Sequence, residues 1–146
     1  MEFEKTFLFM DDVIAAKVAA IERCLRRVEE ESRMDWKRNF THQDALILNL
    51  QRACQTAIDA ASYVVRKRKL GIPTQSREVF SLLEKADLIT FEMVDRLLRM
   101  VGFQNAAVHE HSNANLEIID RIIKNDLQMI DAYTANLLQI DTTDEY

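Results

Sequence analysis

The scarcity of turn-forming residues is the feature that most constrains how this chain can fold. Its 146 residues include only two glycines, Gly71 and Gly102, and one proline, Pro73. A β-sheet protein of this length would need a turn every few residues, and Gly and Pro supply most tight turns. Hydrophobic residues make up 48% of the chain, enough to bury a sizeable core. We therefore predict an all-α fold: a compact antiparallel bundle of four or five helices, forming one domain over residues 1–146.

Apolar residues recur in steps of three and four along the first two predicted helices, which places them on one face of each. The first helix is expected to open at Asp11 or Asp12, whose carboxylates suit a helix N-terminus. The second is expected to open at a capping box, with Thr41 as the cap and Asp44 three residues later. The predicted inner faces are Ile14, Val18, Ile21, Leu25 and Val28 in the first helix, and Leu46, Leu50, Ala53, Ala57, Ala60, Ala61 and Val64 in the second.

The second helix is bounded on both sides by recognisable sequence. The connection before it carries Trp36 and Phe40, which we expect to anchor this segment onto the core. Its end is a basic run, Arg66-Lys67-Arg68-Lys69, where cations suit the negative end of the helix dipole. Gly71 and Pro73 follow as stop signals. The small residues of the inner face would let another helix approach closely, inside the bundle or across a dimer axis.

Three further helices follow from the same periodicity. A short helix is predicted over about 76–88, and a fourth helix is predicted to be capped by Thr90. A fifth helix, capped by Asn113 or Asn115, carries apolar residues as far as Leu137, and the tail 141–146 is polar. The predicted inward residues are Val79, Leu82, Leu83 and Ala86; then Val94, Leu97, Leu98 and Val101; then Leu116, Ile119, Ile122, Ile123, Leu127, Ile130 and Leu137.

Charge and cysteine content limit the classes of function that this chain can have. The net charge is −5, so any contact with nucleic acid would have to come from a local basic patch such as Arg66–Lys69. Cys24 and Cys54 lack the paired spacing of a zinc site and are expected to be buried free thiols in a reducing cytoplasm. No apolar run approaches the ~20 residues that span a bilayer, and no signal peptide is evident. We expect a cytoplasmic protein.

Polar and imidazole groups interrupt the fourth apolar helix between Gly102 and His111. In a helix, Asn105 and His109 share one face, because residues four apart are neighbours, and Gln104 lies on its flank. Gly102 inside a helix predicts a close backbone approach or a kink. By spacing alone such a cluster is common at a solvated helix end. Metal binding by His109 and His111 is not supported, since their spacing suits a strand better.

The chain resembles the HepT branch of the HEPN superfamily, all-helical proteins encoded beside a minimal nucleotidyltransferase. The resemblance covers most of the length, including Leu50–Ala53, Ile58–Ala61, Pro73 and Met100–Phe103. The family motif is Gly-Phe-Arg-Asn, two or three apolar residues, His, any residue, then Tyr. Gly102, Phe103, Asn105, Val108 and His109 match it in place, whereas Gln104 stands at the Arg position and His111 at the Tyr position.

The resemblance implies a metal-independent RNA endonuclease toxin that needs no cofactor. In this family the motifs of two subunits meet in a cleft at a homodimer axis, where the ribose 2′-OH attacks the adjacent phosphate. His109 takes the acid/base role, which suits an imidazole titrating near neutral pH. Asn105 positions the His or the phosphate, and Asp59 orients the cluster. The substrate is RNA, for example tRNA, with backbone contacts from Arg66–Lys69, and the cognate antitoxin is an MNT-type nucleotidyltransferase.

The two departures leave three hypotheses open. Gln104 carries no charge and cannot form a guanidinium fork, and loss of such a donor typically costs ~10²–10³ in rate. His111 has no phenolic hydroxyl, so the antitoxin cannot attach AMP to a motif tyrosine. The chain is then an RNase toxin acting through His109 and Asn105, a catalytically degenerate protein that binds the nucleotidyltransferase, or a nucleotide-presenting subunit of that partner.

Overall fold

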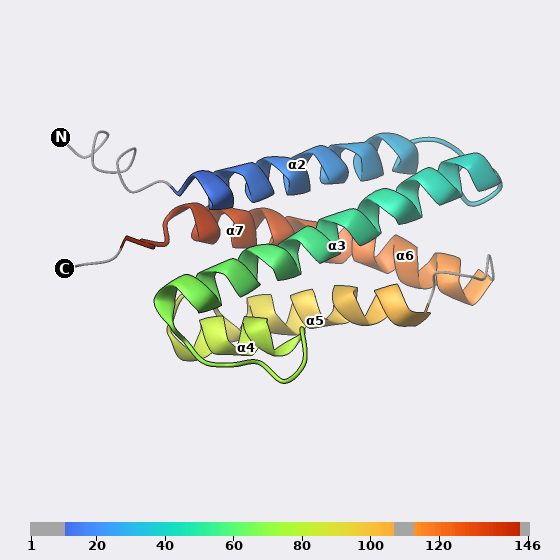
Figure 1. Ribbon diagram of the computed structural model, residues 1–146. Helices are drawn as coiled ribbons and strands as arrows, with labels where there is room; N and C mark the ends of the chain where they lie inside the picture. Colours follow the sequence, from blue (N-terminus) through green and yellow to red (C-terminus); the bar gives the residue numbers. More distant parts are fainter. Residues whose placement is uncertain (1–10, 107–112, 144–146) are drawn as a thin grey trace.

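The computed structural model describes residues 11–106 and 113–143; of residues 104–106, 113 and 114 it gives only their place in a helix. This part of the chain is all-helical, without a strand, which confirms the predicted fold class (Figure 1). None of its helices combines the length and apolarity needed to cross a lipid bilayer. The helices are α2 (Asp12–Ser32), α3 (Phe40–Arg68), α4 (Glu78–Lys85), α5 (Phe91–Ala106), α6 (Asn113–Asn125) and α7 (Leu127–Leu138).

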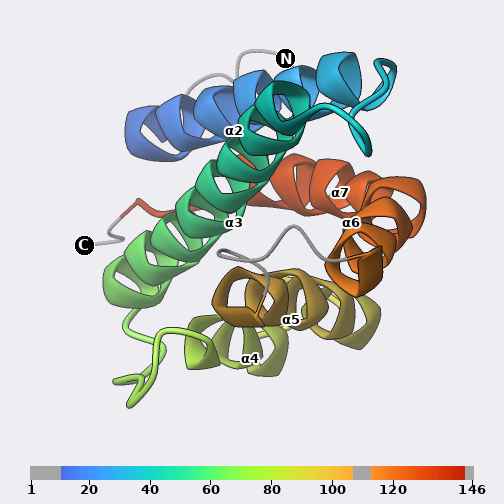
Figure 2. The same cartoon turned by 90° about the vertical axis from the view of Figure 1, so that its right-hand side faces the viewer.

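Helix α3 is the centre of the bundle. It packs along α2, its antiparallel neighbour, and also contacts α4 and α5. Helix α7 packs on α2 and α5 and so closes the core from the other side. Figure 2 shows α3 crossing the molecule between α2 above and α4 and α5 below. The small residues of the α3 inner face, Ala53, Ala57, Ala60 and Ala61, are buried in these contacts, as predicted.

The predicted fifth helix is wrong in one respect, because the structure divides it into α6 and α7 at Asp126. The guanidinium of Arg96 on α5 binds at this break: its Nη1 donates to the carbonyl of Asn125 at 2.7 Å. The same nitrogen lies 3.5 Å from Asp126 Oδ1. A carbonyl held by a side chain from another helix is drawn out of the regular ladder. Since α6 begins at Asn113, Asn115 lies inside its first turn and is not its cap.

The first predicted cap is confirmed and the second is wrong. Asp11 precedes α2 in an extended conformation, and its side chain accepts hydrogen bonds from the first-turn amides. Helix α3 begins one residue before the expected cap, Thr41. Its actual cap is Asn39, which is also extended and accepts from the amide of His42 at 3.2 Å. Asn competes well with Thr for the cap position, which explains the earlier start.

Of the two predicted anchors in the α2–α3 connection, Trp36 is buried and Phe40 is not. Trp36 is 5% exposed, whereas Phe40, at the start of α3, is 64% exposed. The second point of attachment is polar: the fully buried Gln43 donates from Nε2 to the carbonyl of Lys37 at 2.8 Å. A buried amide needs such a partner, and here the partner lies in the connection itself.

Helices α3 and α4 both end with a left-handed residue other than glycine. Lys69 follows α3 with φ 54°, and Asp87 follows α4 with φ 63°. In each case the next amide closes a six-residue loop, from Leu70 to the Val65 carbonyl and from Leu88 to the Leu83 carbonyl, both at 3.0 Å. The chain therefore turns before Gly71, the predicted stop signal, and α4 is shorter than its predicted range.

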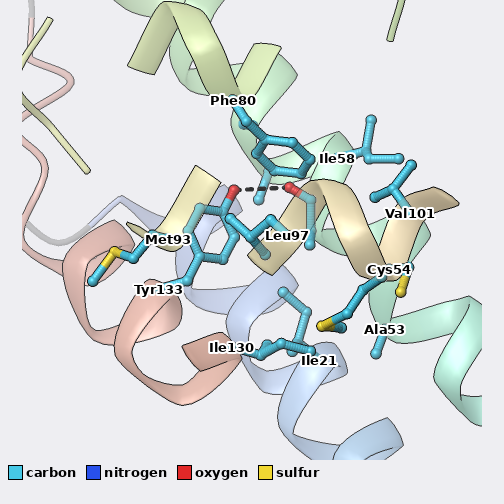
Figure 3. Packing of buried hydrophobic residues seen from close by; sticks show 14 of the residues in the cluster. Ile21, Ala53, Cys54, Ile58, Phe80, Met93, Leu97, Val101, Ile130 and Tyr133 are labelled. Carbon is cyan, nitrogen blue, oxygen red and sulfur yellow. Dashed lines mark hydrogen bonds between the residues drawn. The ribbon is translucent and has the colours of Figure 1, made fainter. Parts of the chain in front are cut away.

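Tyr133 lies at the middle of the core, where α3, α4 and α7 meet. It is fully buried, and its hydroxyl donates to the carbonyl of Ala57 on α3 at 2.9 Å. Its ring packs edge-on against Phe80, with the centroids 5.8 Å apart (Figure 3). The apolar periodicity did not predict Tyr133 or Phe80 as core residues, because neither lies at a position counted in the predicted stripes.

We expect Tyr133→Ala to lower the free energy of unfolding by about 3–5 kcal/mol, since it deletes a buried aromatic ring. Tyr133→Phe keeps the ring packing and loses only the bond to Ala57, so it should cost about 0.5–1.5 kcal/mol. Urea denaturation of both variants measures the two costs. Equal costs for Phe and Ala would show that the hydroxyl, and not the ring, stabilises this junction.

Asp11 joins three parts of the chain. One carboxylate oxygen caps α2, 2.8 Å from the amide of Val13. The other accepts from Tyr63 of α3 and from Thr142 beyond α7, both at 2.6 Å. Burial alone would raise the pKa of Asp11, but these hydrogen bonds outweigh it and hold the pKa below its usual value. The same bond raises the pKa of Tyr63 to about 12.

Asp11→Ala should lower the free energy of unfolding at pH 7 by about 0.5–2 kcal/mol, the usual cost of losing a helix cap. Because the carboxyl pKa is lower in the folded state than in the unfolded state, this contribution is present above the unfolded value of 3.8 and is lost as the pH falls through the folded value. Urea titrations between pH 7 and 3 should therefore show the difference shrinking with acid. Asp12→Ala, one residue along and exposed, is the control. A difference that does not change with pH would contradict the role of the carboxylate.

Candidate functional site

The predicted site lies at the C-terminal end of α5. The helix begins after Thr90, whose hydroxyl accepts from the amide of Met93 at 3.2 Å, as predicted. Gln104 and Asn105 lie in its last turn. His109 and His111 fall outside the described residues, as do the side chains of Gln104 and Asn105. The structure thus places the backbone that carries the first half of the motif.

Apolar contacts fix the end of α5 against the rest of the bundle. Met100, Val101 and Phe103 are 1%, 6% and 4% exposed. Figure 3 shows Val101 beside Ile58 of α3, within the same buried cluster. A helix end that is anchored on a packed core holds its last turn in a defined place, which a positioned acid or base requires.

Gly102 does not provide the close backbone approach that its position predicted. A Cβ added there would meet no atom of the described residues within 4 Å, and α5 continues through Gly102 as one helix. We therefore expect Gly102→Ala to raise the free energy of unfolding by about 0.4–1 kcal/mol, because alanine has less freedom to lose on folding. Thermal or urea unfolding measures the gain. A loss of stability would mean that Gly102 is approached by a part of the chain or a partner outside the described residues.

Asp59 lies on an exposed face of α3, and its Oδ1 accepts from Gln55 Nε2 of the same helix at 3.0 Å. Its chain neighbour Ile58 is buried in the cluster that includes Val101 of α5. Asp59 is therefore carried by the stretch of α3 that packs on α5. This position is compatible with the predicted orienting role without a direct described contact to the motif.

The basic run Arg66–Lys69 is exposed and lies at the other end of the bundle from the end of α5. Figure 1 shows α3 ending at the side of the molecule where α5 begins, whereas α5 ends at the opposite side. Arg68 is engaged there: its Nη1 donates to the carbonyl of Asp141 at 2.8 Å. Within one chain the structure does not bring this run to the described end of α5.

The two arginines upstream of Gln104 on α5 both have acidic partners. Arg99 Nη2 lies 2.8 Å from Asp95 Oδ2. Arg96 is bound to Asn125 and lies 3.5 Å from the buried carboxylate of Asp126. Burial raises the pKa of Asp126 above its usual value, and attraction by Arg99 and Arg96 offsets only part of this rise. Both arginines are thus engaged by groups of the described bundle.

The cysteines are free, as predicted, but only Cys54 is buried, and Cys24 is partly exposed. Burial raises the pKa of the Cys54 thiol to about 12, so it is protonated at neutral pH and is a poor nucleophile. Among the residues that the structure describes, no group of three His, Cys, Asp or Glu side chains could hold a metal ion.

One basic feature was not predicted from the sequence. Arg23 and Arg27 of α2 and Arg52 of α3 line one pocket between these helices. The sequence has no run of basic residues that would indicate it, because the arginines come from two helices and are separated by apolar positions. Only the pairing of α2 with α3 brings them together.

A comparison with known families decides the classification. A family model described as "Ribonuclease HepT-like" matches residues 18–137, which include the whole motif. The chain belongs to the HepT-like ribonuclease family. One HepT-like relative, the "mRNA nuclease HepT" of Shewanella oneidensis, is 41% identical over 121 residues, covering 82% of this chain and 91% of the relative. The "tRNA nuclease HepT" of Aphanizomenon flos-aquae is 26% identical over 113 residues, covering 77% of each chain.

Solved structures of HepT-like proteins share the fold. A tri-AMPylated Shewanella oneidensis HEPN toxin, solved in complex with an MNT antitoxin, matches with a TM-score of 0.82 and 38% identity over 88% of this chain and 98% of the other. A toxin-antitoxin complex with AMP-PNP matches with a TM-score of 0.81 and 38% identity over 88% and 99%. The fold predicted from the HepT resemblance is thereby confirmed.

Proposed function

We propose that this protein is a metal-independent RNA endonuclease, the toxin of a toxin–antitoxin pair, acting in the cytoplasm as one HepT-like domain. The observation that carries the proposal is the 41% identity to an mRNA nuclease over 91% of that relative. The retained Gly102, Phe103, Asn105 and His109 of the family motif support it.

The proposed reaction is an internal transfer of the phosphate. The 2′-oxygen of a ribose forms a bond to the adjacent phosphorus, and the bond from phosphorus to the 5′-oxygen of the next nucleotide breaks. The 2′-hydroxyl gives up its proton and the leaving 5′-oxygen gains one, so the products are a 2′,3′-cyclic phosphate and a 5′-hydroxyl. His109 is the group that moves these protons. Asn105, four residues before it, positions the His109 ring or the phosphate by hydrogen bonding.

The site is proposed to be complete only in a homodimer. One chain contributes a single His109 and a single Asn105, whereas two motifs meeting at a two-fold axis supply an imidazole on either side of the scissile phosphate. Asp59 is the proposed orienting group from α3, and Arg66–Lys69 of each chain are proposed contacts for distant parts of the RNA. Analytical ultracentrifugation of the purified protein tests the dimer.

The proposed partner is an MNT-type nucleotidyltransferase antitoxin, as in the solved Shewanella oneidensis complex. That toxin is tri-AMPylated. Here His111 occupies the place of the motif tyrosine, and an imidazole offers no phenolic oxygen for transfer of AMP. We propose that the antitoxin restrains this chain by binding it. Intact mass after incubation with the antitoxin and ATP should then show no AMP on residue 111.

A second candidate function follows from the same two departures. Gln104 and His111 replace the charged and the modifiable residue of the motif, which is the pattern expected of a catalytically degenerate protein. Such a protein would act only as a binding or nucleotide-presenting partner of the nucleotidyltransferase.

Controlled expression in cells tests which of the two functions holds. The ribonuclease proposal predicts growth arrest by the wild type, relief by His109→Ala, and relief by co-expression of the antitoxin. His42→Ala is the matched control, because His42 pairs with Glu31 at 2.5 Å in the α2–α3 region and has no proposed role in catalysis. No arrest by the wild type would favour the degenerate protein. Growth arrest that persists in His109→Ala would contradict the proposed role of His109.

A further inference from the structure

A pocket of about 540 Å³ opens between α2 and α3, away from the motif helix. Three arginines line it, Arg23 and Arg27 from α2 and Arg52 from α3, and all three side chains are exposed. Among the described residues that line it there is no carboxylate. This is a concentrated positive surface on a chain whose net charge is −5.

The arginines of this pocket differ in how far they are already neutralised. Arg27 pairs with Glu30 at 2.6 Å and with Glu31 at 2.9 Å. Arg23 and Arg52 make no side-chain hydrogen bond or ion pair within the part of the chain that the structure describes. Two unneutralised guanidiniums that share one pocket repel each other, and a bound anion would relieve that repulsion.

The other polar side chains that line the pocket already donate to backbone carbonyls, so the guanidiniums are its principal donors to a ligand. The Thr56 hydroxyl donates to the carbonyl of Arg52 at 2.8 Å, and the Asn49 amide donates to the carbonyl of Ala45 at 2.8 Å. An anion in this pocket would therefore be held mainly by arginine forks. Paired N–H groups of this kind match the oxygens of a phosphate.

We propose that this pocket binds a backbone phosphate of the RNA substrate at a distance from the site of cleavage. The inference rests on the proposed ribonuclease function and adds a second contact to it. A volume of about 540 Å³ lies in the range of sites that hold a whole ligand and so can take a nucleotide unit with its phosphate.

The exposed face of α3 offers a path along which a strand of RNA could continue beyond the pocket. Arg52 and Gln55 are both exposed and three residues apart, so they lie on one face of the helix, together with Asp59, which accepts from Gln55 Nε2 at 3.0 Å. On the adjoining face, Ile58 packs in the cluster that contains Val101 near the end of α5. A strand held at the pocket can therefore cross the exposed face of α3 toward the end of α5.

Binding of an uncleavable RNA tests the proposal independently of catalysis. A fluorescent 2′-O-methyl oligonucleotide lacks the attacking hydroxyl, so its anisotropy reports binding alone. Arg23→Gln and Arg52→Gln should each weaken binding at least about fivefold and reduce the slope of log K against log salt by about 0.7, the value for one contact to a single strand. Arg77→Gln, the same change at the start of α4 and outside the pocket, should match the wild type. Pocket variants that behave like Arg77→Gln would overturn the proposal.

Cys24 provides a reporter inside the pocket. It lines the pocket and is partly exposed, whereas Cys54 is 1% exposed and should not react. The oligonucleotide should slow alkylation of Cys24 by a maleimide several-fold, and Arg52→Gln should raise the oligonucleotide concentration needed for this protection by the same factor as it weakens binding. The same alkylation is also measured with inorganic phosphate and with ATP in place of the oligonucleotide. Protection by either of them without protection by the oligonucleotide would overturn the assignment to RNA.

The failure of each proposal gives a different result. If the wild type cleaves ordinary RNA while the pocket variants bind the uncleavable oligonucleotide normally, the ribonuclease function stands and the pocket proposal falls. If the pocket variants bind weakly while the wild type cleaves nothing, the pocket binds RNA and the proposed catalysis falls.

Discussion

The Gln104→Arg variant is expected to cleave RNA about 10²–10³-fold faster than the wild type. The transition state of the proposed reaction gathers negative charge on the phosphate, and a preorganised guanidinium stabilises that charge with two parallel hydrogen bonds. The family motif has arginine at this position, and this chain has Gln104 in the last turn of α5. The upstream arginines have partners of their own: Arg99 is paired with Asp95, and Arg96 is bound at the α6–α7 junction.

Two further substitutions make the comparison quantitative. Gln104→Lys supplies a positive charge without the planar fork, so its rate should lie between those of the wild type and Gln104→Arg. Gln104→Ala removes the carboxamide and should be no faster than the wild type. Single-turnover cleavage of the same RNA by the four proteins gives the order. If Gln104→Arg were no faster than the wild type, the missing charge would not be what limits this enzyme.

The apolar periodicity predicted a helix well where the residues of that helix alone determine which face is buried. The stripes of the first two helices are buried as predicted, because a helix face must cover the core wherever its apolar residues lie. The fifth helix shows the limit. Its pattern continues unbroken from α6 into α7, whereas at the break Arg96, a residue of another helix, binds the Asn125 carbonyl. Periodicity within one segment contains no information about such a contact.

Helix boundaries could be predicted from the sequence only to within a few residues. Asp11 and Asp12 were both candidates for the cap of α2, and the structure shows that Asp11 is the cap. Before α3 both Asn39 and Thr41 are good caps, and Asn39 caps the helix while Phe40 stays exposed. At the end of α3, Lys69 adopts the left-handed conformation in place of Gly71, because its neighbours Val65 and Leu70 close the turn.

Some features of the candidate site could be predicted from the sequence, and others depend on how the helices pack. The motif from Gly102 to His111 is contiguous in the chain, so the amino-acid sequence alone is enough to identify it. The Arg66–Lys69 run is equally visible in the sequence, but its place at the far end of the bundle depends on the direction of α3. The pocket with Arg23 and Arg52 is not visible in the sequence, because it exists only where two helices pack together.

His109→Ala is expected to slow RNA cleavage by about 10²–10⁴-fold, the usual contribution of a positioned general acid or base. His109 and His111 are the two histidines of the motif, and His42 lies elsewhere, paired with Glu31. His111→Ala and His42→Ala are therefore the matched controls. His111→Ala should retain activity, because the family motif has tyrosine, not a catalytic imidazole, at that place. Loss of activity in all three variants would point to a defect of folding.

RNA cleavage by the purified wild type and by His109→Ala, both in the presence of EDTA, tests whether this chain is a metal-independent ribonuclease. We expect cleavage by the wild type that EDTA does not reduce, products ending in a 2′,3′-cyclic phosphate and a 5′-hydroxyl, and near-complete loss in His109→Ala. Wild-type protein that leaves RNA intact, together with a Gln104→Arg variant that also leaves it intact, would contradict the proposed ribonuclease function. Cleavage that His109→Ala retains in full would contradict it equally.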